Sequence, residues 1–123
     1  MSRTFFVTAA VLGFLGVAGG AFGAHALRGI LDTDVQTVYE TGIRYQMYHV
    51  FALMLAGWAL QKHEASQFRL AGWFFVAGVA LFSGSLYIMS FTGLRWLGAI
   101  TPLGGLAFLA GWLSLIIGFW KLK

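Results

Sequence analysis

The side chains that could bind a ligand or carry a proton are few, and they stand near the ends of long apolar runs. Gln46 and His49 are three residues apart and Ser83 and Tyr87 are four apart, so each pair shares one face if its run is helical. We therefore expect a polar cluster toward one end of the runs, at one common depth. Every run contributes to it: His25, Gln46, His49, Ser83, Tyr87 and Thr101.

Two roles are open for this cluster. Neutral imidazole ligates metals and titrates near neutral pH, so His25 and His49 are the candidate metal or haem ligands or proton carriers. Glu40, Arg44 and the nearby tyrosines could bind polar groups of a haem, a quinone or a metal complex. The alternative is structural, with the polar groups bonding one another and backbone carbonyls to hold the helices together. The residues by themselves identify no cofactor.

A hydrolytic or nucleotide-dependent enzyme is not favoured. Ser83 and Ser85 have no base and acid partner that the sequence identifies, and serines at helix ends are usually structural. The glycine-rich runs lack the lysine of a phosphate-binding loop. With no cysteine, the chain has no thiol nucleophile, thiolate metal site or disulfide.

Four stretches without Asp, Glu, Lys or Arg must position these side chains. Each is close to the roughly 20 residues that a helix needs to cross about 30 Å of hydrocarbon. The stretches are Thr4 to Phe22, Tyr45 to Gln61, Leu70 to Phe91 and Leu97 to Trp120. A composition of 59% hydrophobic and 10% charged residues agrees with burial in a membrane. The sequence predicts an all-α integral membrane protein, a four-transmembrane-helix bundle that forms one domain over residues 1–123.

The first span has a competing interpretation, because an apolar run followed by Ala24-His25-Ala26 imitates a cleaved secretory signal. The run is long for the apolar core of a signal, so we interpret it as the first membrane helix.

The connections between the spans carry two helix-start signals. Thr33-Asp34-Val35-Gln36 has the form of a capping box, which predicts a short amphipathic helix on the outer surface between helices 1 and 2. That segment could instead continue into helix 2, since only Gly42 interrupts helix-compatible residues up to Leu60 and Glu40 to Arg44 is a favourable pair. Thr101-Pro102 predicts the start of helix 4, preceded by an interfacial turn.

The basic residues indicate the topology. With four spans, one side of the membrane holds Arg3, Lys62, Arg69, Lys121 and Lys123, and the other holds Arg28, Arg44 and Arg95. The positive-inside rule therefore favours cytoplasmic N- and C-termini. Because these residues are spread singly along the chain, the net charge of +4 does not predict nucleic-acid binding.

Small residues recur at spacings typical of close helix packing. They form one seam on helix 1 and another on helix 4: Ala9, Gly13, Gly16, Gly20 and Gly23, and Ala107, Gly111, Ser114 and Gly118. Such seams serve either packing within the bundle or a homo-oligomer contact, and the motif does not distinguish the two.

Four stretches of the chain, taken in order, resemble a known family. They are Gly20 to Leu27, Glu40 to His49, Phe82 to Tyr87 and Gly98 to Trp112. Together they are similar to the small bacterial membrane proteins of the domain-of-unknown-function four-twenty-three family, which has eukaryotic relatives among small transmembrane proteins. The resemblance implies a four-helix protein of the bacterial inner membrane, and it implies no particular activity.

Three function classes follow. The first is a non-enzymatic structural or accessory bundle that packs with itself, with lipid or with a partner membrane protein. The second is a ligand or cofactor site on the outer face, built on His25 and His49. The third is a small transporter, for which only His49 could couple protons, because the four carboxylates lie outside the spans.

Overall fold

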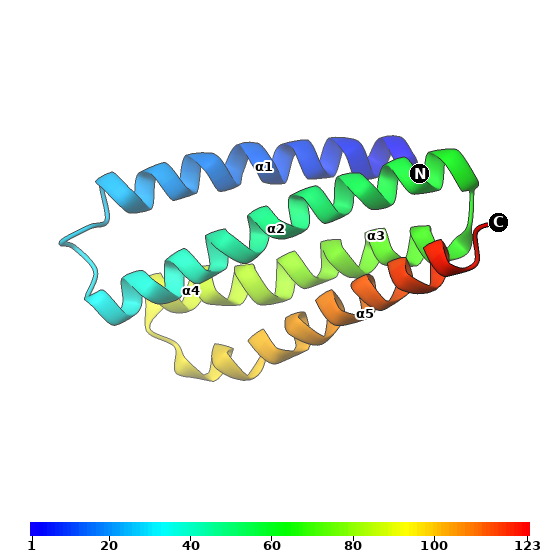
Figure 1. Ribbon diagram of the computed structural model, residues 1–123. Helices are drawn as coiled ribbons and strands as arrows, with labels where there is room; N and C mark the ends of the chain where they lie inside the picture. Colours follow the sequence, from blue (N-terminus) through cyan, green and yellow to red (C-terminus); the bar gives the residue numbers. More distant parts are fainter.

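The computed structural model describes residues 1–123, and helices are its only regular elements. Their order is α1 (Ser2–His25), α2 (Thr33–His63), α3 (Ser66–Gly78), η1 (Val79–Ser83, a π-helical turn), α4 (Gly84–Thr92), η2 (Arg95–Ala99, a 3₁₀ turn) and α5 (Thr101–Trp120). Because α3, η1 and α4 follow one another without a break, the chain forms four long rods (Figure 1).

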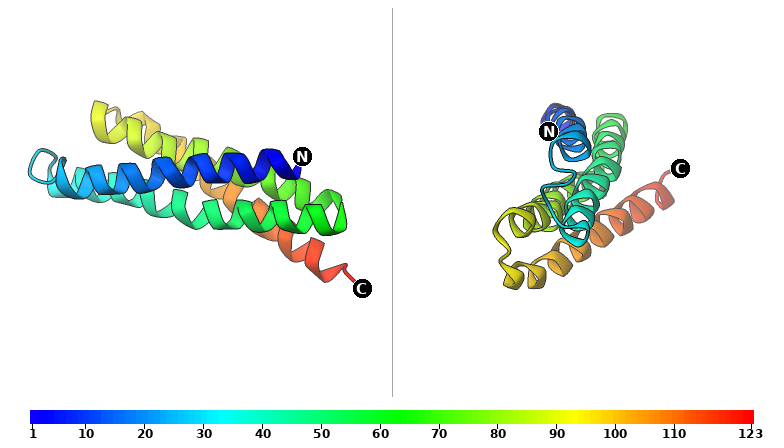
Figure 2. Two further views of the ribbon diagram at one scale, coloured as in Figure 1. Left: turned by 90° about the horizontal axis from the view of Figure 1, so that it is seen from above. Right: turned by 90° about the vertical axis from the view of Figure 1, so that its left-hand side faces the viewer.

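The rods run antiparallel to their neighbours in sequence, and both termini lie at the same end of the bundle (Figure 1). Viewed from one end, α1 and α5 lie on opposite sides of the layer formed by α2 and the α3–α4 rod (Figure 2). At one end of the α1–α2 pair, the Gln36 amide bonds the carbonyl of Gly23. At the other end, Gly57 packs against the ring of Phe6 and the Cβ of Phe5. Helix α2 therefore returns the chain to the level of its N-terminus.

Phenylalanine rings seated on glycines build the core. Phe5, Phe68 and Phe75 are wholly buried, and Phe108 nearly so. Each ring lies where a glycine of a neighbouring helix leaves room: Phe5 on Gly72, Phe68 on Gly118, Phe75 on Gly111 and Phe108 on Gly78. These glycines bring α3 close to α5 and let the Phe5 ring of α1 reach α3, because any side chain in their place would overlap the ring.

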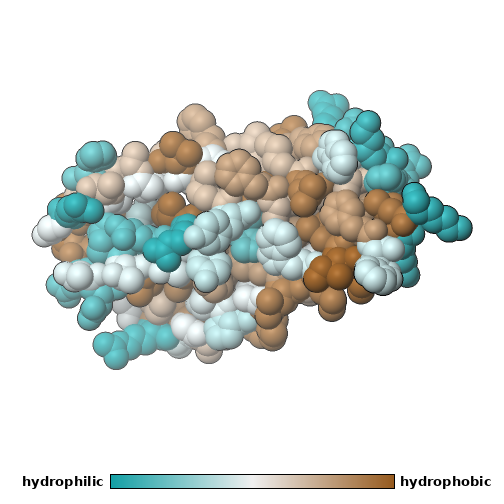
Figure 3. Space-filling view, in the orientation of Figure 1, coloured by the Kyte–Doolittle hydropathy of each residue, from teal (hydrophilic) through white to brown (hydrophobic).

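Three of the four rods are long and apolar enough to cross a membrane: Ser2–His25, Ser66–Thr92 and Arg95–Trp120, with mean hydropathies of 2.0, 1.8 and 1.9. The two ends of the bundle carry most of the hydrophilic surface, and apolar side chains cover much of the face between them (Figure 3). Helix α2 is long enough, with 31 residues, but its composition is not apolar enough to meet the same criterion. It contacts α1 and the α3–α4 rod, and Gln46 and His49 are buried there, whereas Arg44 and Tyr48 are exposed.

The separate surface helix expected between helices 1 and 2 is not formed. Residues 33–44 are the first three turns of α2, which continues unbroken to His63, as the alternative interpretation held. The expected capping box is also wrong, because Asp32 is the N-cap and no side chain caps the first turn. The Gln36 side chain instead donates to Gly23 and to Glu40, so it links two helices.

The start of α5 and the packing of the small-residue seams are confirmed. Helix α5 begins at Thr101 with proline in its first turn, and a short 3₁₀ turn precedes it. On α1, Gly16 and Gly23 lie against side chains of α2, and on α5, Gly111 and Gly118 lie against rings of α3. Both seams therefore pack within the chain.

Candidate functional site

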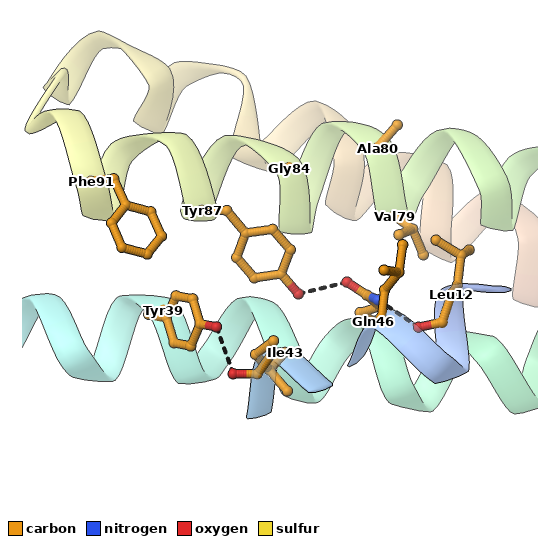
Figure 4. Close-up of a pocket in the computed structure, with 11 residues that line it drawn as sticks. Leu12, Tyr39, Ile43, Gln46, Val79, Ala80, Gly84, Tyr87 and Phe91 are labelled. Atoms are coloured by element: carbon orange, nitrogen blue, oxygen red, sulfur yellow. Dashed lines mark hydrogen bonds between the residues drawn. The ribbon is translucent and has the colours of Figure 1, made fainter. Parts of the chain in front are cut away.

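A chain of hydrogen bonds through Gln46 joins three helices. The Tyr87 hydroxyl of α4 donates to Gln46 Oε1 at 2.6 Å, and Gln46 Nε2 donates to the carbonyl oxygen of Leu12 on α1 at 2.7 Å (Figure 4). Close by, the Ser83 hydroxyl donates to the carbonyl oxygen of Gly42 at 2.6 Å. Gln46 and Ser83 are buried, so these bonds satisfy polar groups that water does not reach.

Helix α2 also holds α1 nearer the loop that joins the two helices. Tyr39 donates from its hydroxyl to the carbonyl oxygen of Gly19 at 2.6 Å, and Gln36 donates to that of Gly23 at 2.9 Å. A carbonyl oxygen has two lone pairs, so it can accept a side-chain donor besides its helix bond. The missing side chains of the two glycines leave these oxygens open to approach.

A crevice of about 470 Å³ lies between α1, α2 and the α3–α4 rod, and Tyr39, Gln46 and Tyr87 line it (Figure 4). Aromatic rings stand together along one part of it, with centroids 5.6 Å apart for Tyr39 and Tyr87 and 5.8 Å apart for Tyr39 and Phe91. Leu12, Leu15 and Val79 line another part. The polar groups in the crevice already bond one another or α1.

His49 has both ring nitrogens engaged. The indole N–H of Trp112 on α5 lies 3.0 Å from His49 Nε2, and His49 Nδ1 lies 2.6 Å from the carbonyl oxygen of Tyr45. Since an indole N–H can only donate, Nε2 is the acceptor, and the proton must sit on Nδ1, which donates to Tyr45. The imidazole is therefore neutral and of one tautomer, with neither nitrogen free to ligate a metal.

The His49 ring also packs among aromatic side chains, near the middle of the bundle. It stacks on Phe108 with ring centroids 3.5 Å apart and planes 7° apart, and Phe75 lies at 5.6 Å. His49 is 5% exposed and occupies the middle of α2, as Phe108 and Trp112 occupy the middle of α5.

A third polar link joins α4 to α5. The hydroxyls of Ser85 and Thr101 lie 2.6 Å apart, and Ser85 also bonds the carbonyl oxygen of Phe82. Thr101 thus forms part of a helix contact instead of joining His49.

The expected single cluster at one depth is wrong, since its members form three separate links. Gln46, Ser83 and Tyr87 lie together, His49 bonds Trp112, and Thr101 bonds Ser85. The expectation placed the outer end of helix 2 at Tyr45, whereas α2 begins twelve residues earlier, at Thr33. His49 therefore lies deeper in the bundle than expected.

His25 is not near His49. It is exposed at the last residue of α1, whereas Gln46, three residues from His49, bonds Leu12. The thirteen residues from Leu12 to His25 correspond to about 20 Å along the helix axis at 1.5 Å per residue. The structure contains no group of three His, Cys, Asp or Glu side chains arranged to hold a metal ion.

Glu40 and Arg44 are on the outer part of α2. The Glu40 carboxylate accepts a hydrogen bond from Gln36 at 3.2 Å, and the Arg44 side chain is exposed. Neither joins His49.

The sequence analysis missed Trp112 and Ser85 as bonding partners. No spacing marks either one, because each partner is on another helix and only the register of α5 brings them together.

Comparison with known proteins gives consistent matches. Residues 19–105 match the family model described as "Protein of unknown function (DUF423)". The chain is 44% identical over 119 residues to a UPF0382 membrane protein of Staphylococcus haemolyticus, with 97% of each chain covered. It is 41% identical to the UPF0382 membrane protein YwdK of Bacillus subtilis, with 94% of each covered. It is 38% identical to the UPF0382 inner membrane protein YgdD of Escherichia coli, with 99% of this chain and 93% of that one covered. No solved structure matches the chain.

Proposed function

This chain belongs to the membrane-protein family described as DUF423, and from that premise we propose that it is a non-enzymatic accessory bundle of the bacterial inner membrane. It crosses the membrane four times and packs with itself, with lipid or with a partner membrane protein. One observation carries the proposal: Gln46, His49 and Tyr87 each bond a group on another helix. The polar side chains inside the bundle therefore serve to hold helices together.

Four crossings are supported by the length and path of α2. If α1 crosses the membrane, a helix that lies alongside it from Gly23 back to Phe6 crosses as well. Its modest hydropathy is compatible with crossing, because its buried polar side chains Gln46 and His49 bond groups on other helices. Polar groups in membrane helices are tolerated where they face the bundle and find partners.

The N- and C-termini then lie on the cytoplasmic side. They stand at one end of the bundle (Figure 1), and the basic residues that flank the spans are more numerous there.

The outer faces of α1 and α5 are the surfaces available for assembly. They lie on opposite sides of the bundle (Figure 2) and expose large apolar side chains over their full length. Lipid or another helix can cover such faces. A protein that acts by packing needs one of them to meet a partner.

Native mass spectrometry of protein extracted gently from its membranes tests the accessory role. We expect a defined complex, with a second copy or with a partner membrane protein. Two triple alanine variants are matched probes of the outer faces: Val7, Val11 and Phe14 on α1, and Leu113, Ile116 and Trp120 on α5. One triple should abolish the complex while the other retains it. A bare monomer without a partner, at all protein concentrations, would contradict the proposal.

A further inference from the structure

A second cavity, separate from the α1–α4 crevice, is a groove of about 710 Å³ between α2 and α5. We name it the α2–α5 groove. Along α5 it runs from Pro102 to Trp112, about 15 Å at the rise of a helix. Its volume lies within the range of small-molecule sites, roughly 300 to 1,000 Å³. It opens on the side of the bundle between two rods, so a ligand would enter from the lipid.

The lining of the groove is aromatic and uncharged. Its residues are Tyr45, Tyr48, His49, Phe82, Pro102, Gly105, Leu106, Phe108, Leu109 and Trp112. His49, the one histidine in the lining, is held neutral by its two hydrogen bonds. A charged ligand would find no counter-charge there and would lose its hydration, which costs several kcal/mol in an apolar site. The groove therefore selects a neutral ligand.

The polar groups left to bind that ligand are hydroxyls. The indole N–H of Trp112 is committed to His49. Tyr45 and Tyr48 are 37% and 55% exposed, and both line the groove. A phenol hydroxyl donates to an oxygen acceptor, while the tyrosine, phenylalanine and tryptophan rings favour a flat partner that stacks offset or edge to face.

Gly105 is one of the residues that line the groove. A methyl group on its Cα would meet nothing within 4 Å, so the packing of the chain does not require a glycine. Its neighbour Gly104 differs, because there a Cβ would overlap the backbone of Phe82. A glycine inside a helix costs about 1 kcal/mol relative to alanine. The absent side chain keeps open the floor of the groove.

We propose that the α2–α5 groove binds a neutral, planar, lipid-soluble ring molecule with oxygen acceptors, of the quinone class. The ring lies over Gly105 among the aromatic side chains, and a ring oxygen accepts a hydrogen bond from Tyr45 or Tyr48. The groove holds this molecule as a bound ligand, which is a role beyond that of a packing bundle.

The test uses fluorescence of Trp112, which lines the groove, in a background where Trp58, Trp73, Trp96 and Trp120 are phenylalanine. These four side chains are between 45% and 86% exposed, so their replacement leaves the core intact. The protein is placed in lipid nanodiscs and titrated with decylubiquinone, whose ring quenches indole fluorescence on contact. Gly105→Leu fills the groove without meeting other atoms of the chain at its Cβ, and Gly98→Leu is the matched control, open in the same way but outside the groove.

We expect saturable quenching in the parent protein and in Gly98→Leu, with the apparent Kd at least about tenfold weaker in Gly105→Leu, equivalent to about 1.4 kcal/mol. The thermal midpoint of Gly105→Leu should not fall below that of Gly98→Leu, which separates loss of binding from loss of fold. Quenching that rises linearly and equally in all three proteins would overturn the proposal, because it reports only partition into lipid. Oleyl alcohol that fully relieves the quenching by decylubiquinone at an equal concentration would also overturn it, in favour of an acyl chain. The proposal is also wrong if the parent protein shows no saturable quenching and Gly105→Leu changes the number of subunits in the complex. In that case the groove binds a helix from another protein.

Discussion

At the scale of single residues, the hydrogen bond from Trp112 determines the state of His49. The imidazole can accept at Nε2 only while it is neutral, and its other nitrogen donates to the carbonyl oxygen of Tyr45. Gaining a second proton would turn this acceptor into a donor that faces another donor. The pair therefore works as a link between α2 and α5 and opposes protonation of the ring.

A double-mutant cycle on this pair measures the link. Trp112→Phe leaves the buried Nε2 of His49 without a donor and should lower the free energy of unfolding by about 1 kcal/mol, within the range measured for bonds between membrane helices. His49→Leu should also destabilise, and the double variant should be less destabilised than the sum of the two. Unfolding in mixed micelles provides the measurement. Trp120→Phe, whose parent side chain is 86% exposed, is the control; strictly additive effects would refute the link.

Tyr87 and Tyr48 are a matched pair of positions for testing the chain of hydrogen bonds through Gln46. Tyr87→Phe removes the donor to Gln46 Oε1 and should destabilise the bundle by about 1 kcal/mol. Tyr48 is exposed, so Tyr48→Phe should leave the thermal midpoint unchanged. Equal thermal midpoints for the two variants would mean that the chain of hydrogen bonds through Gln46 does not contribute to stability.

The sequence identified the polar residues that bond between helices, but it did not identify most of their partners. Gln46, His49, Ser83 and Tyr87 stood out because polar side chains in apolar helices need partners. Those partners include carbonyl oxygens of Leu12 and Gly42 and the indole of Trp112, which depend on how helices distant in sequence are aligned. His25 was included because it is a histidine that follows the outer end of the first apolar run, and its position at the exposed end of α1 separates it from the others.

At the scale of the elements, adjacent glycines on α5 have opposite roles. Gly104→Ala would drive a methyl group into the backbone of Phe82 and should lower the free energy of unfolding by about 1 to 3 kcal/mol, as overpacking does. Gly105→Ala meets open space and should raise it by up to about 1 kcal/mol through better helix propensity. Thermal unfolding of the two variants in one detergent gives the comparison. A larger loss for Gly105→Ala than for Gly104→Ala would show that α5 is turned differently about its axis.

The apolar runs predicted the rods well, and the connections less well. The charged connection between Gln61 and Leu70 and the Thr101-Pro102 start correspond to observed helix boundaries. The extent of α2 could not be settled from the sequence, because the polar residues from Thr33 to Arg44 suit a surface helix and the outer part of a long helix equally. Contacts with α1 through Gln36 and Tyr39 decide in favour of the long helix.

At the scale of the whole molecule, α2 differs in composition from the other three rods, which are the apolar ones. It contacts α1 and the α3–α4 rod, and its buried residues Gln46 and His49 bond other helices, while Phe51 and Trp58 remain exposed. The family resemblance noted in the sequence is confirmed by relatives that cover nearly the whole chain. The four-span bundle is the interpretation that joins these facts, and it requires α2 to cross.

Cysteine accessibility tests that requirement most directly, since the chain has no cysteine of its own. Single cysteines replace the exposed residues Arg28, Asp34, Lys62 and Lys123, and intact cells are treated with a membrane-impermeant maleimide. Four crossings with cytoplasmic termini predict labelling of Arg28→Cys and Asp34→Cys, and protection of Lys62→Cys and Lys123→Cys until the cells are permeabilised. Labelling of Lys62→Cys together with Arg28→Cys in intact cells would place both ends of α2 on one side and contradict the four-span bundle.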